Sequence, residues 1–346
     1  MDAITLTRQL IDIESISGNE AAVGNYLYGE LCRVGYQTCR IPVEDDRFNI
    51  YATSPEQPHP KVVFSTHMDT VPPFIPSTED AARIYGRGSC DAKGIIAAQI
   101  AASERLRQQG IYVGLLFVVG EERDSQGAKV ANEYAANHPG HSAKYLVNGE
   151  PTENHIALAS KGTLRVEVTA SGRMAHSAYP ELGDSAINKL LDALAAIRAI
   201  PLPVDDLLGP STLNIGTIGG GRAPNVIADQ AKAEIFVRLV GDSTSTKDAI
   251  AAAVAGMAEP REMLEIPAVR LGSLPGIQTT VVAYTTDIPA FGGAWGTPFL
   301  IGPGSIHVAH TLDERIPKPQ LEAAVGIYQN MVNQLLRSEA ILPNAT

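Results

Sequence analysis

Hydrophobic residues follow two different patterns along this chain. Residues 61–66 and 115–119 are short apolar runs, typical of strands that are covered on both faces of a parallel sheet. Between them, the Ala- and Ile-rich segment 93–109 follows a glycine-rich turn and predicts a helix. Periodic apolar positions predict two earlier helices, over residues 3–16 and 19–34. This order of helices and strands predicts an α/β fold with a mostly parallel sheet.

The pattern changes near Lys161, where apolar and polar residues begin to alternate. The expected elements are strands at 164–169, 212–218, 232–240 and 268–271, and helices at 185–200 and 245–257. This βαββαβ order predicts a ferredoxin-like insertion. The α/β pattern then returns and ends in an amphipathic helix over 318–336. We therefore expect a discontinuous catalytic domain of residues 1–161 and 273–346, interrupted by an inserted domain of residues 162–272.

Composition narrows the class of protein. With 38 acidic against 27 basic residues the net charge is −11, which argues against a nucleic-acid partner. Neither a long apolar span nor a secretory signal is visible, so we expect no membrane segment. The three cysteines (Cys32, Cys39 and Cys90) are odd in number and show no CxxC spacing. They predict neither disulfides nor a cysteine zinc site, and they favour a reducing cytoplasm.

Acids and imidazoles follow the predicted strands. His67 and Asp69 end the first apolar run, and ligands of open α/β sheets bind outside the carboxyl ends of the strands. We expect His67 to bind a metal and Asp69 to hydrogen-bond its other ring nitrogen, since such partners fix the tautomer of a ligand. The alternative is an ordinary loop histidine near an N-cap aspartate.

Asp91 and the pair Glu121-Glu122 extend this pattern. Asp91 lies in a glycine-rich segment that suits a metal-bridging carboxylate, although the N-cap of the following helix would explain it equally. Two adjacent acids at the end of an apolar run repel each other and resist burial unless a cation is near. We expect Glu122 to coordinate this cation, while Glu121 stays free as a general base.

Glu150 and His310 complete the candidate ligands. Glu150 follows a further predicted strand, and its alternative is a solvent-facing turn acid. His310 follows a Gly/Pro loop, but His307 lies three positions earlier and spacing does not choose between them. Two imidazoles and several carboxylates suit two zinc ions, and cobalt or manganese could use the same ligands.

Five stretches of the chain carry these residues, and two more lie in the expected insertion. They are Ser65–Pro72, Gly86–Gly94, Gly120–Gly127, Asn148–Thr152 and Gly302–Glu314, together with Arg173–Pro180 and Ala223–Ile227. In this order, over essentially the whole chain, they resemble zinc-dependent aminoacylase/carboxypeptidase metallopeptidases. That family includes acetylornithine deacetylase, succinyl-diaminopimelate desuccinylase and glutamate carboxypeptidase.

The resemblance implies a role for each residue of the site. Asp91 would bridge two zinc ions, and His67 and His310 would each complete one ion with one of the two acids Glu122 and Glu150. Asp69 would orient His67. Glu121 would accept the proton of the attacking water.

For the insertion, the resemblance implies a dimerisation surface and a lid. His176 would reach into the site of the partner subunit of a homodimer and stabilise the oxyanion. Asn225 and Arg238 match positions that contact substrate. Arg238 would clamp a carboxylate, unless it is an exposed strand residue.

The expected activity is hydrolysis of the amide bond of a small N-acyl amino acid, as in acetylornithine or acetyl-lysine deacetylases of amino-acid biosynthesis. A carboxypeptidase or dipeptidase would use the same site on peptide bonds, so these residues do not separate the two. The third alternative is a non-catalytic zinc-binding module, which we would expect to have lost Glu121 or a ligand.

Overall fold

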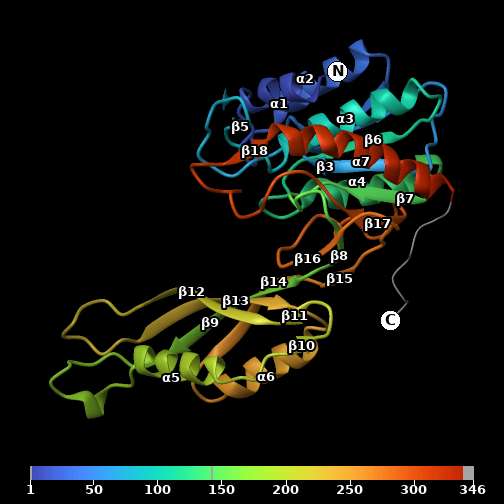
Figure 1. Cartoon of the computed structure of the whole chain (residues 1–346). Coiled ribbons are helices and arrows are strands. Elements are labelled where there is room, and N and C mark those ends of the chain that lie inside the picture. Colours follow the sequence, from blue (N-terminus) through green and yellow to red (C-terminus); the bar gives the residue numbers. More distant parts are fainter. Residues whose placement is uncertain (1, 142, 338–346) are drawn as a thin grey trace. The chain divides into compact units, whose positions relative to one another are not determined.

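The computed structural model describes residues 2–141 and 143–337, which fall into two compact units (Figure 1). Unit 1 takes its described residues from 1–158, 270–280 and 286–346, and unit 2 consists of 159–269 and 281–285. The main segment of unit 2 begins and ends three residues before the expected insertion, which was 162–272. Residues 281–285, which we expected in the catalytic domain, belong to unit 2.

Unit 1 is an α/β unit. Its helices are α1 (Ala3–Ile11), α2 (Ala21–Arg33), α3 (Lys93–Arg107), α4 (Gln126–Asn137) and α7 (Lys318–Leu336), with a 3-10 turn η1 (Pro139–His141). The strands of its main sheet are β1 (Gln37–Glu44), β2 (Arg47–Thr53), β3 (Val62–His67), β6 (Gly114–Val118), β7 (Tyr145–Asn148) and β17 (Thr297–Leu300). A small sheet contains β4 (Thr78–Glu79), β5 (Arg83–Tyr85) and β18 (Arg315–Pro317). The remaining strands of the main sheet, β8 (Ile156–Ser160), β15 (Val269–Arg270) and β16 (Thr279–Val282), include the points where the chain passes from one unit to the other.

The centre of the main sheet is parallel, as the unbroken apolar runs predict. Its strands follow the order β1-β2-β6-β3-β7-β17-β8, and β6, β3, β7 and β17 run parallel. Val62 and Phe64 of β3 share one core with α1, α2, α3 and α7, whereas Val63 shares a second core with α4 and Trp295. Since helices cover both faces, every position of β3 is buried. The α/β class is confirmed.

Parallel strands place their carboxyl ends at the same edge of the sheet. His67, the last residue of β3, pairs with Val118 of β6, and Ser65 pairs with Asn148 of β7. The amide of Met68 donates to the carbonyl of Val118 at 2.8 Å. The loops that follow β3, β6 and β7 therefore leave the sheet side by side.

Two features at the N-terminal end differ from the expectation. Helix α1 ends at Ile11 rather than at residue 16, because the next residues serve the sheet edge: Ile16 pairs with Thr70, and Ser17 hydrogen-bonds Asp69. The β1–β2 hairpin was not predicted. Strand β1 is mostly exposed or half-buried and polar or charged residues make up half of it, so it lacks the unbroken apolar run of the central strands.

Unit 2 confirms the ferredoxin-like arrangement. Its main elements are β9 (Gly162–Ser171), α5 (Ala186–Arg198), β12 (Thr212–Gly220), β13 (Gln230–Leu239), α6 (Thr244–Val254) and β14 (Glu259–Ile266). Its minor elements are η2 (Pro180–Leu182), β10 (Val204–Asp205) and β11 (Gly209–Pro210). The sheet order is β12-β13-β9-β14, and all its pairs are antiparallel.

The expected last strand of the insertion, at 268–271, was wrong. Residues 259–266 form that strand, and 269–270 form β15 of the main sheet. Strand β14 lies at the edge of its sheet and is largely exposed, so polar residues such as Glu259 and Arg261 replace the apolar alternation.

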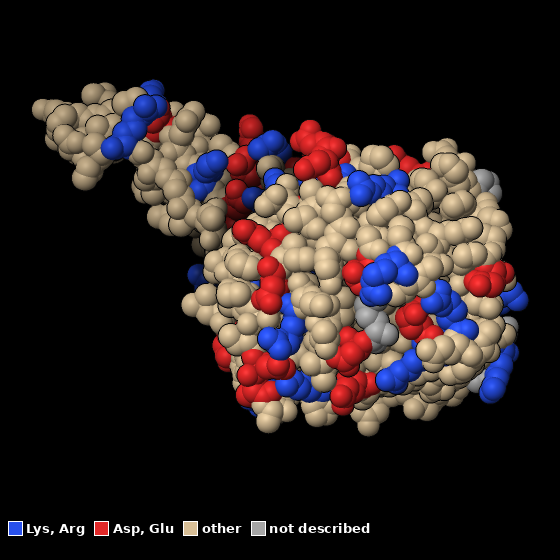
Figure 2. Space-filling model, turned by 90° about the horizontal axis from the view of Figure 1, so that it is seen from above, with Lys and Arg blue, Asp and Glu red and all other residues tan. Residues whose placement is uncertain are grey.

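The side of unit 1 shown in Figure 2 does not carry a single sign of charge. On the side shown in Figure 2, acidic and basic side chains are interspersed over the body of unit 1. Among the described residues, no helix combines the length and the apolar character needed to cross a membrane. Cys32, Cys39 and Cys90 are all free.

Candidate metal centre

Acids and imidazoles from the end of β3 and from four loops of unit 1 meet at the sheet edge. We call His67, Asp91, Glu121, Glu122, Glu150 and His310 the acid–imidazole cluster. Within it, the ligand atoms of His67, Asp91 and Glu150 lie within 4.8 Å of one another, and so do those of Asp91, Glu122 and His310. His67, Glu121 and Glu122 form a third such group. Asp91 belongs to the first two groups. Its Oδ1 is 3.0 Å from Nε2 of His67, and its Oδ2 is 3.4 Å from Nε2 of His310.

The carboxyl groups of the cluster outnumber its imidazoles, and burial makes the ionised form of these carboxyl groups less favourable. Burial and the neighbouring charge of Asp91 hold the pKa of Glu150 well above its usual range, and burial and the charge of Glu150 do the same for Glu121. The Oε1 atom of Glu150 is buried without a hydrogen-bond partner. A divalent cation would balance these charges and give that oxygen a partner, so the residues fit a metal site.

The two imidazoles respond in the opposite direction. Hydrogen bonds to Asp91 and Glu122 raise the pKa of His310 to about 10, and its Nε2 lies 2.9 Å from Oε1 of Glu122. Burial disfavours the charged form of His67, but its contacts with Asp69 and Asp91 outweigh this and raise its pKa. In the metal-free chain these protonated rings therefore supply positive charge that a cation would otherwise provide.

Asp69 joins two of the loops. Its carboxylate accepts hydrogen bonds from Ser17 Oγ at 2.6 Å and from the backbone amides of Glu121 and Glu122 at 3.1 and 3.2 Å. The Nδ1 of His67 is 3.0 Å from the carbonyl oxygen of Asp69 and 3.5 Å from its Oδ1. The backbone carbonyl thus makes the shorter contact with the ring, where we expected the carboxylate to do so.

His310 and His307 occupy different places. His310 reaches Asp91 and Glu122, and its side chain remains 48% exposed. His307 is also exposed but is absent from the described groups of possible ligands. The two side chains lie apart although only three positions separate them in the sequence, because the chain turns here and His310 has a positive φ of 63°.

The three expected site residues of unit 2 do not form one cluster within that unit. His176 and Asn225 are exposed neighbours, since His176 pairs with Val226 and the amide of Ser177 donates to the carbonyl of Asn225. Arg238 is half-buried on β13, where it donates to Thr163 Oγ1 at 3.1 Å and lies over the ring of Phe236.

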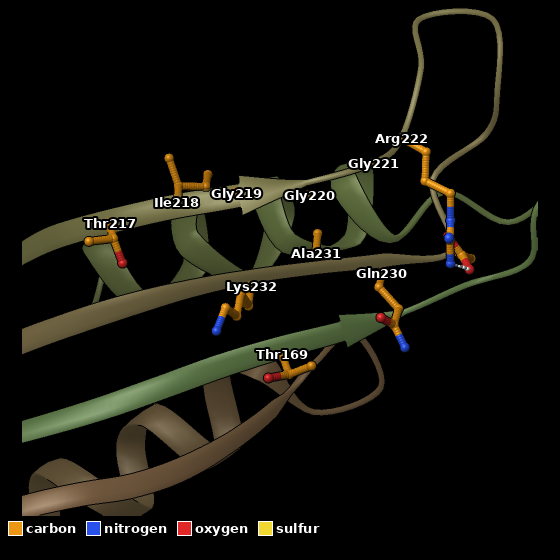
Figure 3. A pocket seen from close by; sticks show the side chains of 11 residues that line it. Thr169, Thr217, Ile218, Gly219, Gly220, Gly221, Arg222, Gln230, Ala231 and Lys232 are labelled. Carbon is orange, nitrogen blue, oxygen red and sulfur yellow. Dashed lines mark hydrogen bonds and ion pairs between the residues drawn. The ribbon is translucent and has the colours of Figure 1, made fainter.

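A separate hollow of about 680 Å³ lies on the sheet of unit 2 (Figure 3). Three glycines, Gly219–Gly221, leave it open, and the ion pair between Arg222 and Asp229 stands at one end. None of the expected substrate-binding residues lines it.

Asp287 was missed by the sequence analysis. It is 1% exposed, its Oδ1 has no hydrogen-bond partner, and burial raises its pKa to about 7 despite a hydrogen bond with Ser125. Its charge bears on both Glu121 and Glu150. The signal that identified Glu121, an acid shortly after a strand, was also present here, since Asp287 lies five residues after the end of β16.

Comparisons with known proteins agree with this geometry. A family model described as "Peptidase family M20/M25/M40" matches residues 63–334. A peptidase M20 domain-containing protein of Schizosaccharomyces pombe is 40% identical over 349 residues, which cover 96% of this chain and 85% of that protein. A probable carboxypeptidase of Aspergillus fumigatus is 36% identical over 384 residues, covering 97% of this chain and 87% of that protein.

Solved structures show the same fold. The crystal structure of a tripeptidase from Staphylococcus aureus has a TM-score of 0.80 at 21% identity, and the match covers 97% of this chain and 98% of that chain. The family model spans most of the sequence and the relatives cover nearly all of it. This protein therefore belongs to the M20/M25/M40 peptidase family and is a metal-dependent hydrolase that acts on carbon–nitrogen bonds.

Proposed function

We propose that this protein hydrolyses the amide bond of a small N-acyl amino acid and that two divalent cations, zinc by preference, serve the reaction. His67, Asp91 and Glu150 would hold one cation, and Asp91, Glu122 and His310 the other, since these are the two groups that share Asp91. Such a pair, when bound, lowers the pKa of water from 15.7 to about 7 and polarises the carbonyl group to be attacked. Cobalt or manganese suits the same ligands.

One observation carries the assignment of the general base. Glu121 is the acid of the cluster that belongs to neither of the two groups that share Asp91, although its ligand atom lies within 4.8 Å of those of His67 and Glu122. Its backbone amide is anchored on Asp69, so its carboxyl group is held at the site without being needed as a ligand there. Burial raises its pKa, and a proton acceptor works best when its pKa is near the operating pH. Glu121 would take a proton from the attacking water and return it to the departing amine.

The rest of the proposal concerns substrate and assembly. Asn225 would contact the substrate, and Arg238, a half-buried residue, would bind the carboxylate of the amino acid. We further propose a cytoplasmic homodimer of amino-acid biosynthesis, in which His176 donates to the oxyanion in the partner subunit. Removing one such donor typically costs about 10²–10³ in rate.

A carboxypeptidase or dipeptidase activity is the second candidate. The 36%-identical relative from Aspergillus fumigatus bears the name probable carboxypeptidase. A peptide bond beside a free C-terminal carboxylate is also an amide of an N-acylated amino acid, so the same catalytic groups would act on it. The size of the acyl group distinguishes the two candidates.

A substrate panel tests the choice between them. Acetyl-ornithine, acetyl-lysine, acetyl-citrulline, succinyl-diaminopimelate and several dipeptides should be compared at equal concentration, with and without a chelator. Faster turnover of the acetyl or succinyl compounds supports the first candidate, and preference for dipeptides replaces it with the second. Turnover that survives complete removal of metal would contradict both.

Glu121→Gln tests the general base. We expect turnover to fall by about 10²–10⁴, while the metal content stays near that of the wild type because Glu121 is not a proposed ligand. Glu56→Gln, at an exposed position, is the control and should leave turnover and metal content unchanged. Full activity of Glu121→Gln would exclude the proposed role.

Hybrid dimers test the role of His176. His176→Ala and Glu121→Gln should each be poorly active, but a mixture should regain part of the activity, since one site of the hybrid has both intact groups. Subunit exchange must be verified with differently tagged chains. If exchange occurs and no activity returns, His176 does not act in the partner subunit.

A further inference from the structure

A buried ion pair lies directly behind the acid–imidazole cluster. The side chains of Arg87 and Glu314 are 2% and 0% exposed, and Arg87 Nη1 donates to Glu314 Oε2 at 2.6 Å. Neither residue belongs to the described groups of possible ligands. Arg87 lies in the stretch Gly86–Gly94 and Glu314 ends the stretch Gly302–Glu314, but neither residue was expected to have a role at the site.

The other oxygen of Glu314 holds the loop that carries Asp91. Oε1 accepts from the backbone amides of Gly88 at 2.9 Å, Cys90 at 3.3 Å and Asp91 itself at 3.3 Å. The carbonyl oxygen of Glu314 also accepts from the amide of Gly86 at 3.1 Å. The carboxylate thus serves as the common acceptor for this turn, and it fixes the backbone of Asp91 directly.

The glycine at position 88 makes this arrangement possible. Gly88 has a φ of 87°, a conformation that L side chains rarely adopt, and its amide makes the shortest backbone hydrogen bond to Glu314. A Cβ atom at this position would lie 2.8 Å from Cδ of Lys93. The turn is therefore built so that its amides face Glu314.

Glu314 also connects two residues of the same proposed cation site. It follows His310 by four positions, and His310 Nε2 lies 3.4 Å from Oδ2 of Asp91. One side chain therefore ties the segment after His310 to the amide of Asp91. A shift of Glu314 would change the distance between the Asp91 carboxylate and the His310 imidazole, which are far apart in the sequence.

The pair is poorly explained by stability alone. Burying two charges costs several kcal/mol each, and an apolar replacement of a buried ion pair is often neutral or stabilising. Here Nη2 of Arg87 is buried without a hydrogen-bond partner, which adds a further cost. Direct metal binding by Glu314 is also disfavoured, because its two oxygens already accept from a guanidinium and three amides.

We propose that Glu314, held by Arg87, is a positioning residue that sets the affinity of the site for cations by fixing Asp91 relative to His310. This inference rests on the proposed function, since it requires Asp91 and His310 to be ligands. Partners behind a ligand typically contribute about 10- to 100-fold to metal affinity.

The test compares Glu314→Gln with a matched control. Glu20→Gln removes one charge of another buried ion pair, in which Arg47 Nε donates to Glu20 Oε2 at 2.7 Å. The variants are stripped of metal, checked for native circular dichroism, and titrated with Zn²⁺ against a chromophoric chelator. We expect Glu314→Gln to bind Zn²⁺ about 10- to 100-fold more weakly than the wild type. Glu20→Gln should lose stability towards urea but keep its Zn²⁺ affinity.

Arg87→Lys is the second variant, and its Zn²⁺ affinity tests the inference if Glu314→Gln does not fold. It keeps the charge and leaves Glu314 free to accept from the loop amides, so we expect a smaller loss of affinity. Unchanged Zn²⁺ affinity in the folded variants overturns the inference, and so does an equal loss in Glu20→Gln. If the wild-type protein itself binds no Zn²⁺, Mn²⁺ or Co²⁺, the proposed function fails instead.

Discussion

Asp287 offers the sharpest test of the electrostatics of the site. Burial raises its pKa from 3.8 to about 7 in the metal-free chain. The folded state therefore favours the neutral acid, whereas the unfolded chain ionises near pH 3.8. The contribution of this group to stability is fully present below pH 3.8 and is lost as the pH rises through about 7. Asp287→Asn removes the ionisation while keeping a similar shape.

The size of the effect follows from the two pKa values. The difference between about 7 and 3.8 corresponds to about 4 kcal/mol at 1.36 kcal/mol for each pH unit. The hydrogen bond with Ser125 loses its charged acceptor in the variant, which costs about 1 kcal/mol. We therefore expect metal-free Asp287→Asn to exceed the wild type by about 3 kcal/mol in free energy of unfolding at pH 8. Between pH 8 and pH 5 most of this difference should disappear, since linkage reduces it by about 3 kcal/mol.

Urea denaturation of the chelator-treated protein measures this directly. The single tryptophan, Trp295, is fully buried in unit 1, and its fluorescence reports the unfolding of the unit that contains Asp287. Asp46→Asn, at an exposed position, is the control and should follow the wild type at every pH.

A specific result would refute the reasoning. If wild type and Asp287→Asn differ by the same amount at pH 5 and pH 8, Asp287 does not titrate in this range. If the variant is the less stable protein at pH 8, the buried carboxylate has a partner that outweighs its burial.

Two further predictions concern metal and core. Saturating Zn²⁺ at about 100 times its dissociation constant should stabilise the metal-free protein by about 2.7 kcal/mol per site, and an unchanged urea midpoint at Trp295 would argue against cation binding. Phe64→Ala should cost about 3–5 kcal/mol, because Phe64 is fully buried in β3 between Leu115 and Val147; a loss below 1 kcal/mol in the same urea assay would show that this core collapses around the cavity.

Short-range pattern was enough to identify the α/β class. Apolar runs at β3 and β6, with a helix between them, require both faces of a parallel sheet to be covered, and the two cores around Phe64 and Val63 do this. The βαββαβ order of unit 2 was visible because β9 and β13 have alternating burial, and β12 alternates between exposed and half-buried positions over its first five residues. Edge strands such as β1 and β14 escaped prediction because solvent removes the need for apolar residues.

The residue types of the candidate site could also be predicted from short segments of the sequence. Acids and imidazoles at strand ends are visible in a sequence, since parallel strands bring their carboxyl ends to one edge. The motifs of the chain identified its family, and with it a metal-dependent hydrolase.

Pairing within the site depended on tertiary structure. No spacing shows that Glu150 lies beside His67 and Glu122 beside His310, or that His310 rather than His307 approaches Asp91. The same holds for Asp287, and for Glu314, which reaches amides more than 220 positions away. Residue type and strand order determine which groups arrive at the edge of the sheet. Their distances and pKa values come from loops packed against one another, because burial and through-space charge depend on neighbours in space rather than in sequence.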